Sequence, residues 1–275
     1  MPIDPSTQSI DIRRIITGLV LAAVLLLALW FRGLPLLFVI LLVCALGLWE
    51  FYSLFWGTSR VPSRVCAIIL GWGMICLTWM HRPQDALVFL GAGFVLASMS
   101  FLFRWDVLEE DNAFASSGIF MAGLAYVPLL LLPATYLSTT KLIFVIAAVA
   151  ISDTSAYFVG TRFGHHKLWP RVSPKKSSEG AVGSLVGCVI FCAIYGSIYG
   201  KTGWFSFALL GIAINAFAQL GDLFESALKR SVNIKDSAGL LPGMGGVLDM
   251  FDSLTFTPAV LYFYLVWFVG QAVAS

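Results

Sequence analysis

Charged residues are scarce in this chain. Asp, Glu, Lys and Arg make up 12% of its 275 residues, whereas hydrophobic residues make up 59% and the mean hydropathy is +0.89. A soluble domain has about 25% charged residues, so this composition cannot cover the surface of a water-soluble globule. Intrinsic disorder is excluded by the same numbers, because disordered chains are poor in apolar residues. The sequence therefore predicts an integral membrane protein.

Strong net charge and cysteine motifs are also lacking. The formal net charge is +2, which gives no reason to expect a nucleic-acid partner. The five cysteines lie inside apolar runs without a C-x-x-C pair, which favours small buried side chains over a zinc site or disulfides. Arg13 and Arg14 precede the first apolar run, but no small-residue cleavage site follows it. We therefore expect an uncleaved first span rather than a signal peptide.

Nine apolar segments are close to the length of about 20 residues that a membrane-spanning helix needs. We expect an all-α fold, a polytopic helical bundle of about nine transmembrane helices that forms a single domain over residues 1–275. The segments are 15–31, 34–56, 65–80, 86–103, 113–136, 142–160, 181–200, 204–221 and 253–273.

The distribution of Lys and Arg predicts the orientation. Thirteen of the 17 basic residues lie on alternate connections beginning with the N-terminus. Cytoplasmic loops attract this excess, so we expect the N-terminus inside and a location in the inner, cytoplasmic membrane. The four basic residues expected on the opposite side are Arg32, Arg82, Lys141 and Lys201. Two long segments, 161–180 and 222–252, fall on the cytoplasmic face, where we expect the chemistry.

The segment 222–252 carries carboxylates at both ends. Asp222, Glu225, Ser226 and Lys229 follow helical spacing and form one stripe if the eighth helix continues past Gly221. An ion-pair ladder on a solvated helix is the alternative. The C-terminal end of the segment favours the polar stripe over the ladder. Asp249 and Asp252 lie there just inside an apolar helix, where carboxylates are costly unless they are paired or bound to metal.

Carboxylates at this interface favour Mg²⁺, which is bound through one or two carboxylates together with substrate phosphates. Basic residues and glycines between the two acidic ends favour phosphate binding. The residues concerned are Lys229, Arg230, Lys235, Gly245 and Gly246.

The segment 161–180 offers a second group of polar residues. Lys175 and Lys176 are candidates for binding phosphate, and an anchor for acidic lipid headgroups is the strong alternative. Ser177 or Ser178 can cap the following helix, whose N-terminus favours an anion. Three further residues are expected to support the site: Asp153, which we expect to be buried in the sixth span, Tyr157, and Glu50 at the inner end of the second span.

At these residues the chain resembles the CDP-diacylglycerol synthase family, also called phosphatidate cytidylyltransferases. The family has a spaced pattern of Ser, Lys-Arg, Lys-Asp, Leu-Pro-x-His-Gly-Gly and Asp-Arg-x-Asp. Every spacing agrees over 27 residues from Ser226 to Asp252. The matching positions are Ser226, Lys229-Arg230, Lys235-Asp236, Leu241-Pro242-Gly243-Met244-Gly245-Gly246 and Asp249-Met250-Phe251-Asp252.

The resemblance implies transfer of CMP from CTP to phosphatidic acid, which gives CDP-diacylglycerol and pyrophosphate. It implies Mg²⁺ as cofactor, which a monovalent cation could accompany, with Asp222 and Asp249 as ligands and Asp252 and Glu225 as secondary ones. Lys229 and Lys235 would bind phosphates, and Lys175 and Lys176 would hold the triphosphate. CTP, phosphatidic acid and membrane lipids are the expected partners, and a homodimer is compatible with the sequence.

Two positions depart from the family pattern. Met244 stands where the family has His, and Met250 where it has Arg. No role of that His or Arg carries over to this chain, whereas every carboxylate of the pattern is kept. Two other functions stay open: a CTP-dependent polyprenol or lipid kinase, and a cation-coupled transporter. Transporters place polar groups near mid-membrane, whereas these acids gather at one interface.

Overall fold

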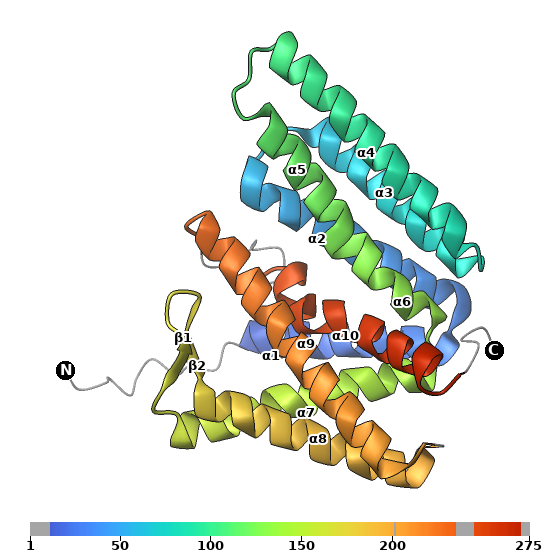
Figure 1. The fold of residues 1–275 in the computed structure, drawn as a ribbon, viewed down its shortest axis with the longest axis vertical. Helices are drawn as coiled ribbons and strands as arrows, with labels where there is room; N and C mark the ends of the chain where they lie inside the picture. The colour runs from blue at the N-terminus through green and yellow to red at the C-terminus, as the bar shows by residue number, and fades with distance from the viewer. Residues whose placement is uncertain (1–11, 201, 235–244, 271–275) are drawn as a thin grey trace.

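A computed structural model describes residues 12–200, 202–234 and 245–270, and most of them are helical (Figure 1). The first six helical elements are α1 (Ile12–Phe31), α2 (Gly33–Trp56), α3 (Val61–Trp79), α4 (Pro83–Asp106), α5 (Ala113–Leu124) and the π-helical turn η2 (Ala125–Leu129). The others are α6 (Leu130–Tyr136), α7 (Thr139–Phe163), α8 (Ser178–Tyr199), α9 (Gly203–Ser231) and α10 (Val247–Trp267). Within the described residues, each of the nine predicted segments coincides with helix apart from a few terminal residues, and residues 271–273 of the last segment lie outside them.

Seven helical segments among the described residues are long and apolar enough to cross a membrane. They comprise α2, α3, α4, the composite α5–η2–α6, α7, α8 and α9. The apolar stretch described in α1 is shorter, at Ile16–Phe31, and α10 is not among the seven. An all-α polytopic membrane protein is therefore confirmed, and the count of nine spans stays a prediction.

The composite span α5–η2–α6 contains two prolines that interrupt its α-helix. Pro128 lies inside η2 and Pro133 inside α6. Proline lacks the N–H that an α-helix needs and its ring crowds the preceding turn, and a π-turn accommodates such a break. Tyr126 of this turn packs edge-on against Phe224 of α9, with ring centroids 5.1 Å apart. The irregular span therefore supports the C-terminal half of α9, which carries the predicted stripe.

The loop predicted over 161–180 contains an element that the sequence analysis missed. Strands β1 (Lys167–Trp169) and β2 (Ser173–Ser177) pair antiparallel and lead directly into α8. The register pairs Lys167 with Ser177. A two-stranded hairpin this short is not stable alone, so its packing on α8 and α9 holds it in place.

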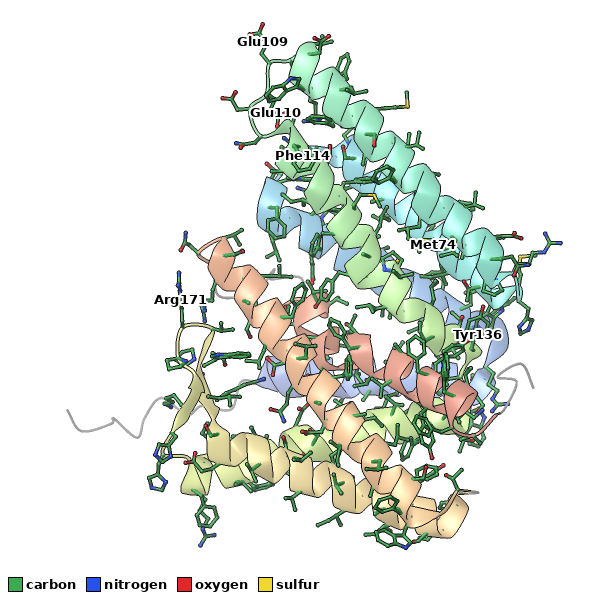
Figure 2. The ribbon with its side chains drawn as sticks, in the orientation of Figure 1. Met74, Glu109, Glu110, Phe114, Tyr136 and Arg171 are labelled. Atoms are coloured by element: carbon green, nitrogen blue, oxygen red, sulfur yellow. The ribbon has the colours of Figure 1, made fainter. Side chains whose placement is uncertain are left out.

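One end of the bundle collects the long connections. In Figure 1 the hairpin and the last turns of α9 lie at the same side as the loop between α4 and α5. Figure 2 shows Arg171 at the tip of the hairpin, and Glu109 and Glu110 in the loop after α4. An even number of spans separates these connections, so they share one membrane face whichever way the protein is oriented.

Candidate active site

Helix α9 extends past Gly221 to Ser231, so the predicted polar stripe is helical. Glycine at 221 allows α10 to approach closely, because a Cβ there would lie 2.3 Å from the carbonyl oxygen of Asp252. This contact between two backbones brings the acidic ends of the 222–252 segment together. The stripe on α9 and the first turns of α10 form a single polar cluster.

The first turn of α10 is held by two carboxylates. Asp249 Oδ2 accepts a hydrogen bond of 2.9 Å from the N–H of Gly246. Glu50 of α2, which is fully buried, accepts hydrogen bonds of 2.8 Å from Val247 N and 2.7 Å from Leu248 N. Anionic groups at a helix N-terminus satisfy its free N–H groups and interact favourably with its dipole. Glu50 therefore supports the site by positioning α10.

Glycine is required where the chain enters α10. Gly245 has φ +86°, a conformation that side chains with a Cβ rarely adopt. A Cβ at this position would also lie 2.6 Å from Asp249 Oδ2. Gly245 and Gly246, which were predicted to bind phosphate, therefore have a structural role: they allow the Asp249 side chain to cap the N-terminus of α10.

Lys229 joins the two helices. Its Nζ lies 2.5 Å from Asp249 Oδ1 and 3.4 Å from Glu225 Oε1. The Lys229 and Asp249 side chains are 14% and 15% exposed, and that of Glu225 is fully buried. Within the described residues, neither carboxylate oxygen of Glu225 accepts a hydrogen bond, and Lys229 is its ion-pair partner. A buried carboxylate in this state favours a further cation beside it.

A second pair of charges lies nearer the solvent. Lys176 at the end of β2 forms a salt bridge with Asp222 of α9, and both side chains are about 30% exposed. The Ser226 hydroxyl is 3.4 Å from Asp222 Oδ1. The two Lys–Asp pairs therefore follow one another along the α9 stripe, the first semi-exposed and the second mostly buried.

A cavity of about 400 Å³ opens beside the Lys176–Asp222 pair. Helices α7, α8 and α9 and the hairpin form its walls, and Lys175, Tyr157 and Asp153 line it. Asp153 is exposed to this space, which corrects the prediction that it is buried in the sixth span. The cavity lies between α7, α8, α9 and the hairpin, so the Asp153 side chain faces open space there instead of packing against a neighbouring helix.

Ser152, Ser184 and Gln219 of the cavity wall belong to a hydrogen-bonded network that the sequence did not reveal. Asn215 Nδ2 donates to the Ser152 and Ser184 hydroxyls at 2.8 and 2.9 Å. Gln219 Nε2 donates to Asn215 Oδ1 at 2.7 Å. Asn215 and Gln219 extend the α9 stripe toward its N-terminus at spacings of four and three residues, so the stripe, followed further, would have identified them.

The comparison with known proteins supplies the family. The model of the cytidylyltransferase family matches residues 12–268. The chain belongs to this family. The phosphatidate cytidylyltransferase of Brucella abortus is 33% identical over 267 residues, which cover 95% of this chain and 96% of the relative. That of Bacillus subtilis is 38% identical over 130 residues, about half of each chain, and that of Staphylococcus saprophyticus 34% identical over 180 residues.

The residues of this cytidylyltransferase that suit a metal are carboxylates. Among the residues described, no three Asp, Glu, His or Cys side chains are close enough to form a complete metal site. Mg²⁺ in nucleotide-dependent enzymes needs only one or two carboxylates, since substrate phosphates and water complete its coordination. Asp222 and Asp249 lie on adjacent helices, and the buried carboxylate of Glu225, which shares Lys229 with Asp249, lies beside them, so these residues fit that requirement.

The structure brings together most of the predicted site residues of this cytidylyltransferase. Ser177 caps α8, as predicted, by accepting a hydrogen bond from Gly180 N. Arg230 is exposed and donates to the carbonyl oxygen of Ile234 at 3.3 Å, away from the two Lys–Asp pairs. The predicted phosphate ligand Lys235, its neighbour Asp236 and the departing residue Met244 lie outside the described residues.

Proposed function

We propose that this protein is a phosphatidate cytidylyltransferase, which transfers CMP from CTP to phosphatidic acid and releases pyrophosphate. The observation that carries the proposal is the similarity to the Brucella abortus enzyme over nearly the full length of both chains. The paired Lys and Asp side chains beside an open cavity support it. Phosphoryl transfer depends on positioning and charge neutralisation more than on covalent help from the protein.

In the proposed reaction, a phosphate oxygen of phosphatidic acid attacks the α-phosphorus of CTP. A new P–O bond joins CMP to the lipid, and pyrophosphate leaves with the electron pair of the broken P–O bond. The attacking phosphate is already ionised at neutral pH, so no general base is required. Lys175 and Lys176 at the cavity would neutralise the triphosphate, and Lys229 would do so closer to α10.

We further propose that Asp222 and Asp249 bind Mg²⁺, with Asp252 and Glu225 beside them. Bound Mg²⁺ would neutralise negative charge on the transferred phosphoryl group and on pyrophosphate. Asp222 forms an ion pair with Lys176, and Asp249 forms one with Lys229. When nucleotide phosphates bind, the lysines can turn toward them and release carboxylate oxygens.

The orientation is part of the proposal. We place the N-terminus and the cavity on the cytoplasmic side of the inner membrane, where CTP is found, and count α1 and α10 as spans, which makes nine. The bias of Lys and Arg between alternate loops supports this orientation. A reporter active only outside the cytoplasm should be active after Ser275 and silent near Pro170. The reverse pattern at both positions would overturn it.

Labelled CTP tests the reaction. Purified protein is incubated with phosphatidic acid and CTP labelled either at the α-phosphorus or at the γ-phosphorus, with and without EDTA. We expect lipid-bound label only from α-labelled CTP, and loss of labelling with EDTA. Transfer of γ-label would indicate a lipid kinase. Absence of lipid labelling from protein that is folded and inserted would contradict both enzymatic functions and leave the transporter.

A further inference from the structure

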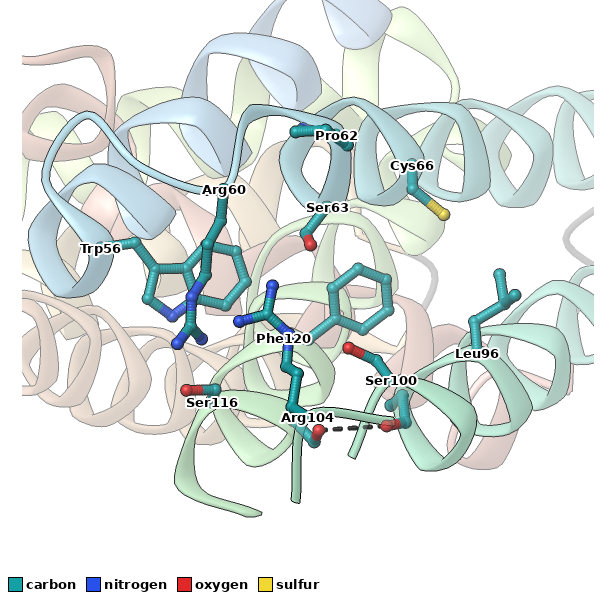
Figure 3. Close-up of a pocket in the computed structure, with 12 residues that line it drawn as sticks. Trp56, Arg60, Pro62, Ser63, Cys66, Leu96, Ser100, Arg104, Ser116 and Phe120 are labelled. Carbon is teal, nitrogen blue, oxygen red and sulfur yellow. Dashed lines mark hydrogen bonds between the residues drawn. The ribbon is translucent and has the colours of Figure 1, made fainter. Parts of the chain in front are cut away.

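A second cavity of about 230 Å³ lies at the same membrane face as the candidate active site but between other helices. Figure 3 shows Arg60 and Arg104 side by side in it, at the junction of α2 with α3 and at the end of α4. The residues that line it come from α2 to α5, and none is shared with the cavity beside Asp222. It is therefore a separate feature of the molecule.

Positive charge is in excess in this cavity. Both guanidinium groups share the carboxylate of Glu110, with Arg104 Nη1 at 2.9 Å from Oε2 and Arg60 bound to Oε1. The Arg side chains are only 17% and 22% exposed. Each guanidinium has five N–H donors, so one carboxylate satisfies only a part of them. The acidic neighbours Glu109 and Asp111 are exposed and do not line the cavity.

The walls combine hydroxyl groups with apolar side chains. Ser63 and Ser100 line the cavity together with the two arginines, and Phe120 and Leu96 are apolar residues of its wall (Figure 3). Leu96 also begins an exposed apolar face of α4 that continues one turn further with Met99, 62% exposed. A ligand with a phosphate at one end and hydrocarbon at the other matches this arrangement, and 230 Å³ holds a headgroup but not acyl chains.

The backbone at this cavity is strained. Arg60 has φ +60° and Glu109 has φ +51°, and a residue with a Cβ in this left-handed region costs about 1–2 kcal/mol. Such strain persists where the surrounding structure requires it and is common at binding sites. Here it directs the Arg60 side chain over the Trp56 ring, 5.4 Å from its centroid, and toward Arg104.

We propose that this cavity binds the headgroup phosphate of an anionic phospholipid through Arg60 and Arg104, with the acyl chains along the exposed face of α4. The lipid bound here does not react, because the site is formed by different helices from the CTP cavity. The proposal is thus independent of the proposed function. A soluble phosphate offers the same polar chemistry without the hydrocarbon, so the test includes both.

The test counts lipids retained by the full-length protein. Protein is released from nanodiscs of phosphatidylcholine containing a minor fraction of phosphatidylglycerol, and retained lipid is identified by native mass spectrometry. The double variant Arg60→Gln/Arg104→Gln should retain about tenfold less phosphatidylglycerol, since charge-assisted hydrogen bonds are lost. Arg82→Gln is the matched control, because Arg82 is exposed and lies at the opposite end of α3 and α4. It should retain phosphatidylglycerol normally.

Glu110→Gln keeps the proposal testable if the double variant fails to fold. Removal of the shared carboxylate frees both guanidinium groups, so phosphatidylglycerol retention should rise; unchanged or lower retention overturns the proposal. Inorganic phosphate added to phosphatidylcholine nanodiscs should not shift the melting temperature. The proposal of a lipid site would be overturned if phosphate shifted the melting temperature of the wild type but not of the double variant, and no lipid were selectively retained. The site would then be assigned to a soluble anion.

Discussion

The two cavities at this end of the bundle hold their charges in different ways. Beside α9 and α10, each lysine is paired with one aspartate: Lys176 with Asp222 and Lys229 with Asp249. Between α2 and α5, two arginines share the single carboxylate of Glu110. The first arrangement has more carboxylates than lysines, because Glu225 also lies beside Lys229, whereas the second has an excess of positive charge.

The supports of the two clusters differ as well. The α9–α10 pairs lie on helices whose backbones touch at Gly221, and Glu50 of α2 fixes the start of α10. Glu110 lies instead in the short connection between α4 and α5. A change in the packing of α9 against α10 should therefore displace the side chains of the α9–α10 cluster and leave those of the Glu110 cluster in place. This difference orders the expected effects of substitutions.

The largest effect is expected from Asp249→Asn. The Asn oxygen can still accept the Gly246 N–H, so α10 should begin normally, but Lys229 loses its ionised partner and the proposed Mg²⁺ loses a ligand. We expect turnover with CTP and phosphatidic acid to fall on the order of 10³-fold or more. Glu109→Gln is the control, because Glu109 is an exposed acid outside both cavities. This variant should turn over CTP and phosphatidic acid at the wild-type rate.

The metal assignment is contradicted if Asp249→Asn inserts into the membrane normally and retains near-full Mg²⁺-dependent turnover. Insertion is checked by the amount of protein in washed membranes and by its melting temperature in detergent. A variant that is absent from the membrane reports on folding alone, and turnover of Asp222→Asn then decides the assignment.

The contact between α9 and α10 gives the next effect. An alanine at 221 would place its Cβ 2.3 Å from the Asp252 carbonyl oxygen, and relief requires the two helices to move apart. We expect Gly221→Ala to lower the stability by about 1–3 kcal/mol. Gly118→Ala in α5 is the matched control, because a Cβ there would meet no atom of the described part of the chain within 4 Å. Melting temperatures should fall for the first variant and stay level or rise for the second.

The sequence was sufficient to predict features that depend on nearby residues. Apolar runs predicted the helices, and spacing along one helix predicted the stripe from Asp222 to Lys229 because α9 is continuous there. The Ser177 cap was also predictable, since a cap is satisfied within one turn. The family pattern identified the segment from Ser226 to Asp252 through its spacing alone.

Features that join distant parts of the chain were not predictable. Glu50 lies 197 residues before Val247, whose N–H it accepts, and only the packing of α2 against α10 brings them together. The pairing of Lys176 with Asp222 depends on where the hairpin folds over α9, and the hairpin itself has only a few residues to signal it. Asp153 appeared buried because the sequence reveals an apolar helix but not the cavity beside it.

A smaller effect is expected at the cavity beside Asp222, where we propose that CTP binds. Lys175 and Lys176 line it, and Lys175 is exposed. Replacing both with Gln should raise the KM for CTP by about tenfold, since two charge-assisted contacts weaken, while kcat at saturation changes less. Lys167→Gln removes a charge from the same hairpin outside the cavity and should leave KM unchanged. An unaltered KM with reduced expression would favour the lipid-anchor role.

The smallest effect concerns the pH dependence of the Glu110 cluster. Partial burial alone would raise the pKa of Glu110, but the hydrogen bond from Arg104 and the charges of Arg60 and Arg104 outweigh it, so the pKa is lowered. A carboxyl group whose pKa is lower in the folded state stabilises the protein above its unfolded pKa of about 4.3. This contribution is lost as the pH falls through the folded pKa. Partly exposed ion pairs contribute about 0.2–1 kcal/mol each. The melting temperature in detergent should therefore decrease only slightly more for the wild type than for Glu110→Gln between pH 5 and pH 3. Equal decreases for the two proteins would mean that the arginines do not hold Glu110 ionised, and that this cluster is no more dependent on charge than the rest of the loop.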